Sequence, residues 1–268
     1  MPTHRITLRI TFIVMLAVCV NGQHLSGSCP PVSVQSSEEK ADADLFNTPG
    51  VELTKKGDVE GALEIFREAT ARFPNDAVSW NNVGVILSAK LGKHKESLHY
   101  FERAICLDPK FAFAFYSLGT AYLKLSEYGL SESHLAQAIE LQPGYVEALN
   151  NLGSVYLRTG RFKQAEKLFE QMHKERPDDF FAANNLAAAF FYNKKFKQAE
   201  NIYRRLIGAE PDRQVLHFNL AAALLRRGER SEAIRIYSFL NNQSSPFAQE
   251  LYNGLFAGKI INLNPIDK

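Results

Sequence analysis

A segment of 34 or 35 residues occurs five times along this chain, and no other feature restricts its fold so strongly. The clearest pair is NNLGSVYLRTGRFKQAE, which begins at Asn150, and NNLAAAFFYNKKFKQAE, which begins at Asn184. One apolar position recurs at spacings of 35, 34, 34 and 34 residues, as Val83, Leu118, Leu152, Leu186 and Leu220. A fixed period of this length is typical of proteins that stack one supersecondary unit on the next.

Each copy contains two runs of helical periodicity. In 146–179 the first run places on one helix face Leu149, Leu152, Gly153 and Tyr156. The second run does the same with Ala165, Phe169 and Met172. Gly160 reverses the chain between them, and Pro177 ends the second helix because proline cannot continue one. The sequence therefore predicts helix–turn–helix units, each of which must bury its apolar face against a neighbour.

This pattern resembles the tetratricopeptide repeat (TPR) family, in which small residues at positions 8 and 20 let the paired helices approach closely. The copies at 112–145 and 180–213 carry the same pattern, with Gly119 or Ala187 at position 8 and Pro143 or Pro211 at position 32. The resemblance implies an all-α fold, a right-handed α-solenoid of helix–turn–helix repeats.

The repeat divides the chain as follows. The expected units are 43–76, which is degenerate, then 77–111, 112–145, 146–179, 180–213 and 214–245. A signal peptide (1–22) and a flexible polar linker (23–42) precede them, and a capping helix and tail (246–268) follow, with Phe247, Leu251 and Leu255 at helical spacing. Pro49 is expected to shorten or kink the first helix. The extra residue of 77–111 is expected within Lys90–Lys95.

The amino terminus predicts export. Arg5 and Arg9 precede an apolar run of 11 residues from Ile10 to Val20, about half the length that spans a bilayer. Small Gly22 follows at a suitable cleavage position, so a secretory signal is the preferred interpretation. An uncleaved anchor that begins near Ile6 is the alternative. The protein is therefore expected to be periplasmic, secreted or tethered to a membrane through its amino terminus.

Two of the three cysteines remain after such cleavage, Cys29 and Cys106. Cys29 follows LSGS, a context similar to that of acylated cysteines in bacterial lipoproteins, and is a possible lipidation site. Cys106 falls on a predicted helix, as a buried thiol or as the disulfide partner of Cys29. The two lack the C-x-x-C spacing of zinc or dithiol sites.

Composition and motifs exclude several functions. Cleavage removes two of the 31 basic residues and none of the 29 acidic ones, which leaves no excess of positive charge for a nucleic acid. The chain has no H-E-x-x-H, Gly-rich phosphate loop or G-x-S-x-G motif, and its histidines are scattered. We therefore expect no catalytic site, no metal and no cofactor, and not an enzyme.

The resemblance directs attention to the concave groove of a TPR array, where such proteins bind ligands. Position 6 of the five copies reads Asn82, Ser117, Asn151, Asn185 and Asn219. This is similar to the asparagine-lined groove of O-linked N-acetylglucosamine transferase, in which carboxamides pair with the backbone of an extended peptide. The alternative is that each asparagine satisfies its neighbouring turn. The lysine and asparagine pattern of the chaperone-binding carboxylate clamp is absent.

Aromatic residues also occupy predicted groove positions: Phe113, Tyr116, Phe181, Phe191, Tyr192 and Phe218. Exposed rings in a concave surface anchor ligands, although Phe191 or Tyr192 is expected to pack between units. The hypothesis is an exported, non-catalytic scaffold whose groove binds extended segments of other proteins. The alternative is a lipid-tethered assembly or bridging factor of a cell envelope.

Overall fold

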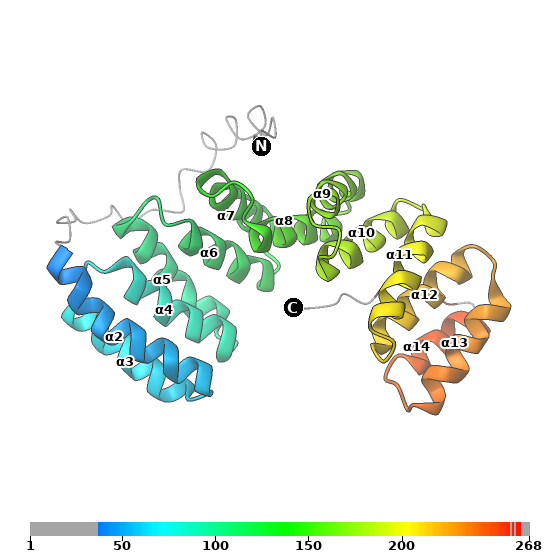
Figure 1. The fold of residues 1–268 in the computed structure, drawn as a ribbon, viewed down its shortest axis with the longest axis horizontal. Coiled ribbons are helices and arrows are strands. Elements are labelled where there is room, and N and C mark those ends of the chain that lie inside the picture. Colours follow the sequence, from blue (N-terminus) through cyan, green and yellow to red (C-terminus); the bar gives the residue numbers. More distant parts are fainter. Residues whose placement is uncertain (1–36, 258, 260, 264–268) are drawn as a thin grey trace. The chain divides into compact units, whose positions relative to one another are not determined.

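The computed structural model describes residues 37–257, 259 and 261–263, and every regular element among them is a helix (Figure 1). The chain forms two compact units, Met1–Leu152 and Gly153–Lys268, and the division falls inside α8 (Val146–Arg158). The expected all-α fold of helix–turn–helix repeats is confirmed.

Antiparallel helix pairs make up both units. Before α8 the pairs are α2 (Ser37–Lys56) with α3 (Val59–Arg72), α4 (Ala77–Val85) with α5 (His94–Leu107), and α6 (Ala112–Lys124) with α7 (Tyr128–Leu141). After it come α9 (Phe162–Glu175), α10 (Phe180–Tyr192) with α11 (Phe196–Ala209), α12 (Gln214–Arg226) with α13 (Arg230–Asn242), and α14 (Ala248–Phe256). Second helices also pack against the first helix of the next pair, as α3 does on α4, α5 on α6 and α11 on α12.

Local residue chemistry starts the helices and reverses the chain. Asp76 caps α4 by accepting a hydrogen bond from the Ser79 N–H at 2.8 Å, and Asp179 caps α10 in the same way. The turn inside each pair needs a left-handed residue, which is Gly160 in one repeat (φ 73°) and Lys194 in the next (φ 63°).

A glycine lets the two helices of a pair come close. In α8, a Cβ at Gly153 would lie 2.2 Å from the Phe169 ring of α9. In the second pair, a Cβ at Gly84 would lie 2.6 Å from the Phe101 ring. The large residue of the second helix therefore occupies the space that a side chain on the first helix would fill, as the sequence pattern predicts.

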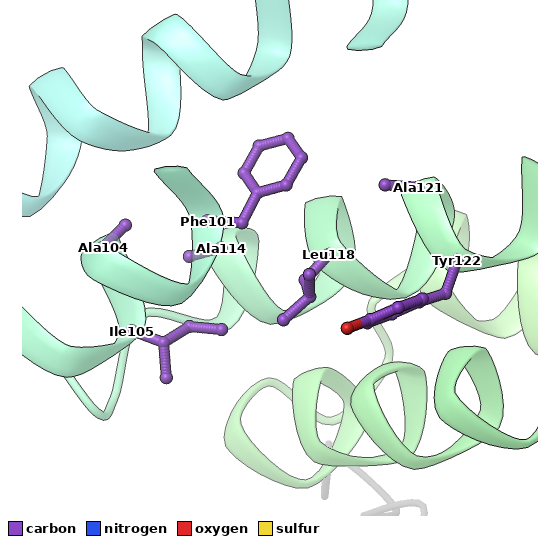
Figure 2. Packing of buried hydrophobic residues seen from close by; sticks show 7 residues of the cluster. All are labelled: Phe101, Ala104, Ile105, Ala114, Leu118, Ala121 and Tyr122. Carbon is purple, nitrogen blue, oxygen red and sulfur yellow. The ribbon is translucent and has the colours of Figure 1, made fainter. Parts of the chain in front are cut away.

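The core lies between successive pairs. Figure 2 shows Phe101 and Ile105 of α5 packed with Leu118 and Tyr122 of α6, all buried. Each such side chain contributes about 1.5–3 kcal/mol on burial. One pair alone would leave this surface exposed, so the repeats stabilise one another.

The first helix differs from its prediction. α2 is not short: it runs for 20 residues through Pro49, and it begins at Ser37, so residues 37–42 are helical and not linker. Proline removes one backbone hydrogen bond, but Ala43 and Gly50 on either side of it are buried. Packing of α2 on α3 outweighs that loss.

The extra residue of the second repeat is absorbed by a π-helical turn, η1 (Ile86–Lys90). The Leu91 N–H donates to the Ile86 carbonyl at 3.1 Å, five residues back. A π turn accommodates one inserted residue without interrupting the helix. The π turn that absorbs the insertion therefore ends at Lys90, the first residue of the predicted segment Lys90–Lys95.

The chain after the last repeat forms the expected capping helix. α14 buries Leu251 and Leu255 against the preceding helices, and Phe247 stands at its amino-terminal cap. This element covers apolar surface that the last repeat would otherwise expose.

Candidate functional site

The position-6 asparagines of three repeats stand half-buried, and two of them bond to a neighbouring helix. The Asn82 Nδ2 donates to the Asn47 Oδ1 of α2 at 3.2 Å, and the Asn151 Nδ2 donates to the Thr120 Oγ1 of α6 at 2.9 Å. Asn185 accepts from the Asn184 Nδ2 at 3.3 Å. The bonds of Asn82 and Asn151 therefore link the first helices of successive repeats, which sequence reasoning did not foresee.

A row of three aromatic rings, one exposed and two half-buried, runs from the first helix of the third repeat to the start of α8. We call Phe113, Tyr116 and Tyr145 the α6 aromatic row. The centroids of Phe113 and Tyr116 lie 5.9 Å apart, and those of Tyr116 and Tyr145 lie 5.0 Å apart. Phe113 is 40% exposed although it is a large apolar residue. The row is the kind of surface that anchors a ligand side chain.

Polar groups border the row on the same face. Burial raises the pKa of the Tyr116 phenol, hydrogen bonds with Thr120 and Asn151 oppose this, and the negative charge of Glu147 adds to it. Burial also raises the pKa of Tyr145, with Tyr116 and Glu147 adding to the effect. Both phenols are therefore neutral near pH 7 and can donate hydrogen bonds. An exposed carboxylate, Glu147, stands beside them.

The predicted residues of the later repeats are placed differently. Phe181 is half-buried and meets the Phe180 ring edge-on at 5.5 Å. Phe218 is fully buried, and its ring packs 5.4 Å from that of Phe247. Asn219 is buried as well, at 1% exposure. The expectation that Phe218 and Asn219 line a binding groove is therefore corrected, because both are buried and Phe247, in the chain that leads into α14, packs on Phe218.

Of Phe191 and Tyr192, one of which is expected to pack between units, Tyr192 does so. Phe191 is buried, and Tyr192 stacks on Phe162 of the preceding repeat with centroids 4.9 Å apart and planes 11° apart. With Lys194, Phe196, Arg226 and Asn262 they line a cavity of about 320 Å³. The part played by Asn262, which lies far along the chain, has no signal in the repeat pattern.

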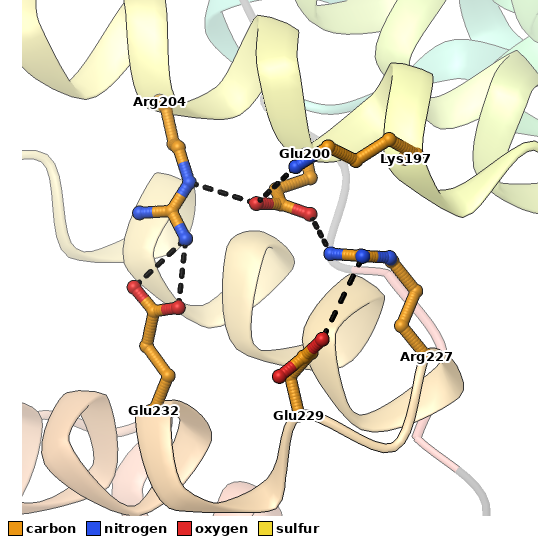
Figure 3. A network of polar contacts seen from close by, with 6 residues as sticks. All are labelled: Lys197, Glu200, Arg204, Arg227, Glu229 and Glu232. Carbon is orange, nitrogen blue, oxygen red and sulfur yellow. Dashed lines mark hydrogen bonds and ion pairs between the residues drawn. The ribbon is translucent and has the colours of Figure 1, made fainter.

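A network of charged side chains centred on Glu200, which we call the Glu200 clasp, joins α11 to the repeat formed by α12 and α13 (Figure 3). Buried Glu200 of α11 accepts hydrogen bonds from Lys197 at 3.1 Å, from the Arg204 Nε at 3.0 Å, and from Arg227. Arg204 also bonds both oxygens of Glu232 on α13 at 2.8 Å. Burial alone would raise the pKa of Glu200, but these cations outweigh it and hold the pKa below its usual value. A carboxylate held in this way joins repeats and is a poor general base.

Other expected sites can be checked on the described residues alone. They contain no group of three or more His, Cys, Asp or Glu side chains that could hold a metal ion. None of their helices combines the length and the apolar character that crossing a membrane requires. Cys106 is half-buried and disulfide-bonded, which corrects its interpretation as a free thiol. Cys29, the possible lipidation site, lies outside the described residues, as does the signal segment 1–22.

A chain built of stacked helix–turn–helix pairs is a helical-repeat protein. The Tetratricopeptide repeat profile matches residues 50–112, 116–180 and 184–238, which is more than half of the chain. The chain belongs to the tetratricopeptide repeat family, whose members are generally non-catalytic scaffolds for protein–protein interaction.

Individual relatives share the repeats over part or most of the chain. The peroxisomal targeting signal receptor of Eremothecium gossypii is 28% identical over 102 residues, which are 38% of this chain and 18% of the receptor. The match thus spans less than a fifth of that relative. The structure of PilW, a type IV pilus biogenesis factor, has a TM-score of 0.71 at 17% identity over 78% of this chain and 97% of PilW.

A third similar protein is YrrB, described as a TPR protein with an unusual peptide-binding site. Its TM-score is 0.57 at 17% identity, over 69% of this chain and 96% of YrrB. At such identities the structural similarities establish a shared fold.

Proposed function

We propose that this protein is a non-catalytic scaffold that binds an extended segment of a partner protein on the α6 aromatic row. The supporting observation is the row itself, in which Phe113 is exposed on α6 and half-buried Tyr116 lies beside the carboxamide of Asn151. Family membership supports protein–protein interaction in general, and the fold is shared with a protein that has a peptide-binding site.

The row and its border suit a particular kind of segment. An apolar side chain of the partner would pack on Phe113 and Tyr116, where rigid rings lose little conformational entropy on binding. Hydroxyl and carboxamide groups of Tyr116 and Asn151 both donate and accept, as a peptide backbone requires. The exposed Glu147 carboxylate favours a Lys or Arg next to the apolar anchor.

This proposal is tested by selecting linear peptides on the purified protein and measuring the dissociation constant of the best binder. Tyr116→Ala should weaken binding roughly ten-fold or more, the loss expected for an aromatic anchor. Tyr252→Ala is the matched control, because Tyr252 is 44% exposed on α14 and lies outside the row. Equal affinities for the wild type and Tyr116→Ala, with unchanged melting temperatures, would exclude the row.

Export belongs to the same proposal and is supported by the sequence of residues 1–22, with Arg5 and Arg9 before the apolar run. Mass spectrometry of the amino terminus of the protein from its native cell tests it. A chain that begins at Gln23 is the expected result. A diacylglyceryl-modified Cys29 would instead support the lipid-tethered assembly factor. An intact Met1 would contradict both cleavage before Gln23 and processing at Cys29.

A further inference from the structure

The chain that follows α14 turns back onto the repeats. The carbonyl of Asn253 accepts hydrogen bonds from the Ala257 N–H at 3.0 Å and from the Lys259 N–H at 3.2 Å. The described residues beyond this turn are Lys259 and Ile261–Leu263, which we call the tail segment. No helix or strand is assigned to it.

An apolar side chain seats the tail segment. Ile261 is only 6% exposed, although it lies outside every helix. A Cβ placed on Gly254 would stand 2.0 Å from its Cδ1 atom. The missing side chain of Gly254 therefore makes room for Ile261 on the surface of α14.

The main chain of the tail segment contacts an aromatic residue of the repeats. The Leu263 backbone lies beside the Tyr192 hydroxyl at the end of α10 and lowers its pKa, although burial, the larger effect, raises it. Stacking on Phe162 fixes the Tyr192 ring. A seated apolar side chain together with a main-chain contact is a common means by which proteins hold extended peptides.

Space and positive charge remain beside the tail segment. Asn262 lies at the edge of the cavity of about 320 Å³ that Tyr192, Lys194 and Arg226 also line. Lys194 and Arg226 are exposed cations, and neither has an ion pair within the described part of the chain. The tail segment offers these cations an amide, whereas a carboxylate would complement them.

We propose that the surface formed by Tyr192, Gly254, Lys194 and Arg226 is a second peptide-binding site, which the tail segment occupies in cis and thereby blocks. Its external ligand is an extended protein segment that has an apolar residue at the Ile261 seat, followed directly by an acidic residue where the tail has Asn262. The acidic side chain would pair with Lys194 and Arg226, so the partner would bind this surface more tightly than the tail segment does. This inference shares with the proposed function only the class of ligand, because it concerns a different surface.

The test uses a chain that ends at Ala257 and two synthetic peptides. One peptide has the sequence of residues 258–268, and the other carries Asn262→Asp. The shortened chain should bind the first peptide, and the second roughly ten-fold more tightly, as expected for one charge-assisted contact. Lys194→Gln together with Arg226→Gln should abolish that gain. The full chain should bind both peptides at least ten-fold more weakly, because its own tail competes.

A point variant of the full chain separates a displaced tail from a damaged fold. Ile261→Asp should release the tail and give the full chain the affinity of the shortened one, whereas the control Lys259→Ala should leave the site blocked. Equal affinity of the full and shortened chains for the first peptide would overturn the proposal, as would the absence of any gain from Asn262→Asp. Unfolding of Ile261→Asp would show that the segment is part of the core and would also overturn it. None of these results depends on the α6 aromatic row.

Discussion

At the scale of single residues, small side chains decide how closely the helices of a pair approach. The space above Gly153 is filled by the Phe169 ring, which is fully buried. Ala165, on the facing side of α9, is buried too. A small residue on one helix of the pair thus faces a large residue on the other. A larger side chain at the first position therefore requires a smaller one at the second.

Gly153→Leu should destabilise the protein by about 1–3 kcal/mol, because the new side chain overlaps the Phe169 ring and overpacks the pair. Ala165→Leu should have a similar cost. Lys163→Leu is the control, since Lys163 is exposed on the same helix. Urea denaturation of the three variants measures the free energy of unfolding, and equal values for all three would contradict the assigned faces.

At the scale of elements, helix α7 packs on α6 through a half-buried histidine. The His134 ring stacks on Tyr122, with centroids 5.6 Å apart and planes 9° apart, and Phe115 lies 6.2 Å away. Burial lowers the pKa of His134 from its usual 6.5 to about 4. The imidazole is therefore neutral in the folded protein over the whole range between these values.

This arrangement makes stability depend on pH. Between pH 6.5 and about 4 the unfolded chain binds a proton at His134 that the folded chain does not, so stability falls as the pH is lowered. From pH 7 to pH 5 this site should cost about 2 kcal/mol. His134→Phe keeps an aromatic ring and should remove that part of the loss. If the wild type and His134→Phe lose equal stability between pH 7 and pH 5, His134 is not buried as a neutral ring.

The sequence predicted the elements better than their contacts. The 3.6-residue period and the recurring Gly and Pro residues identify the repeats, because these signals are local. The prediction that Pro49 shortens or kinks the first helix is wrong for its length, because packing of α2 on α3 overrides the local helix-breaking tendency of proline. The π turn at Ile86–Lys90 is a second departure, because the inserted residue was predicted in the segment that follows this turn.

The candidate site was predicted only in part for the same reason. Tyr116 and Asn151 share a face because the repeat places them there. The burial of Phe218 depends on Phe247, and the cover over Tyr192 depends on Leu263, residues that the repeat pattern does not relate to them. Contacts made by chain outside the repeats have no periodic signal.

At the scale of the whole molecule, stacked repeats leave two kinds of surface. One, the α6 aromatic row, lies in the unit Met1–Leu152 and carries one exposed and two half-buried rings beside a carboxylate. The other, in Gly153–Lys268, is occupied by the chain's own tail segment. Charged contacts such as the Glu200 clasp join neighbouring repeats of that second unit.

Hydrogen exchange with and without the selected peptide tests the central claim most directly. Binding on the α6 aromatic row should slow amide exchange in α6 (Ala112–Lys124) and in residues 146–152, while α13 (Arg230–Asn242) keeps its free-state rates. Protection confined to α13, or to any helix other than α6 and α8, would contradict the claim that this row is where the protein meets its partner.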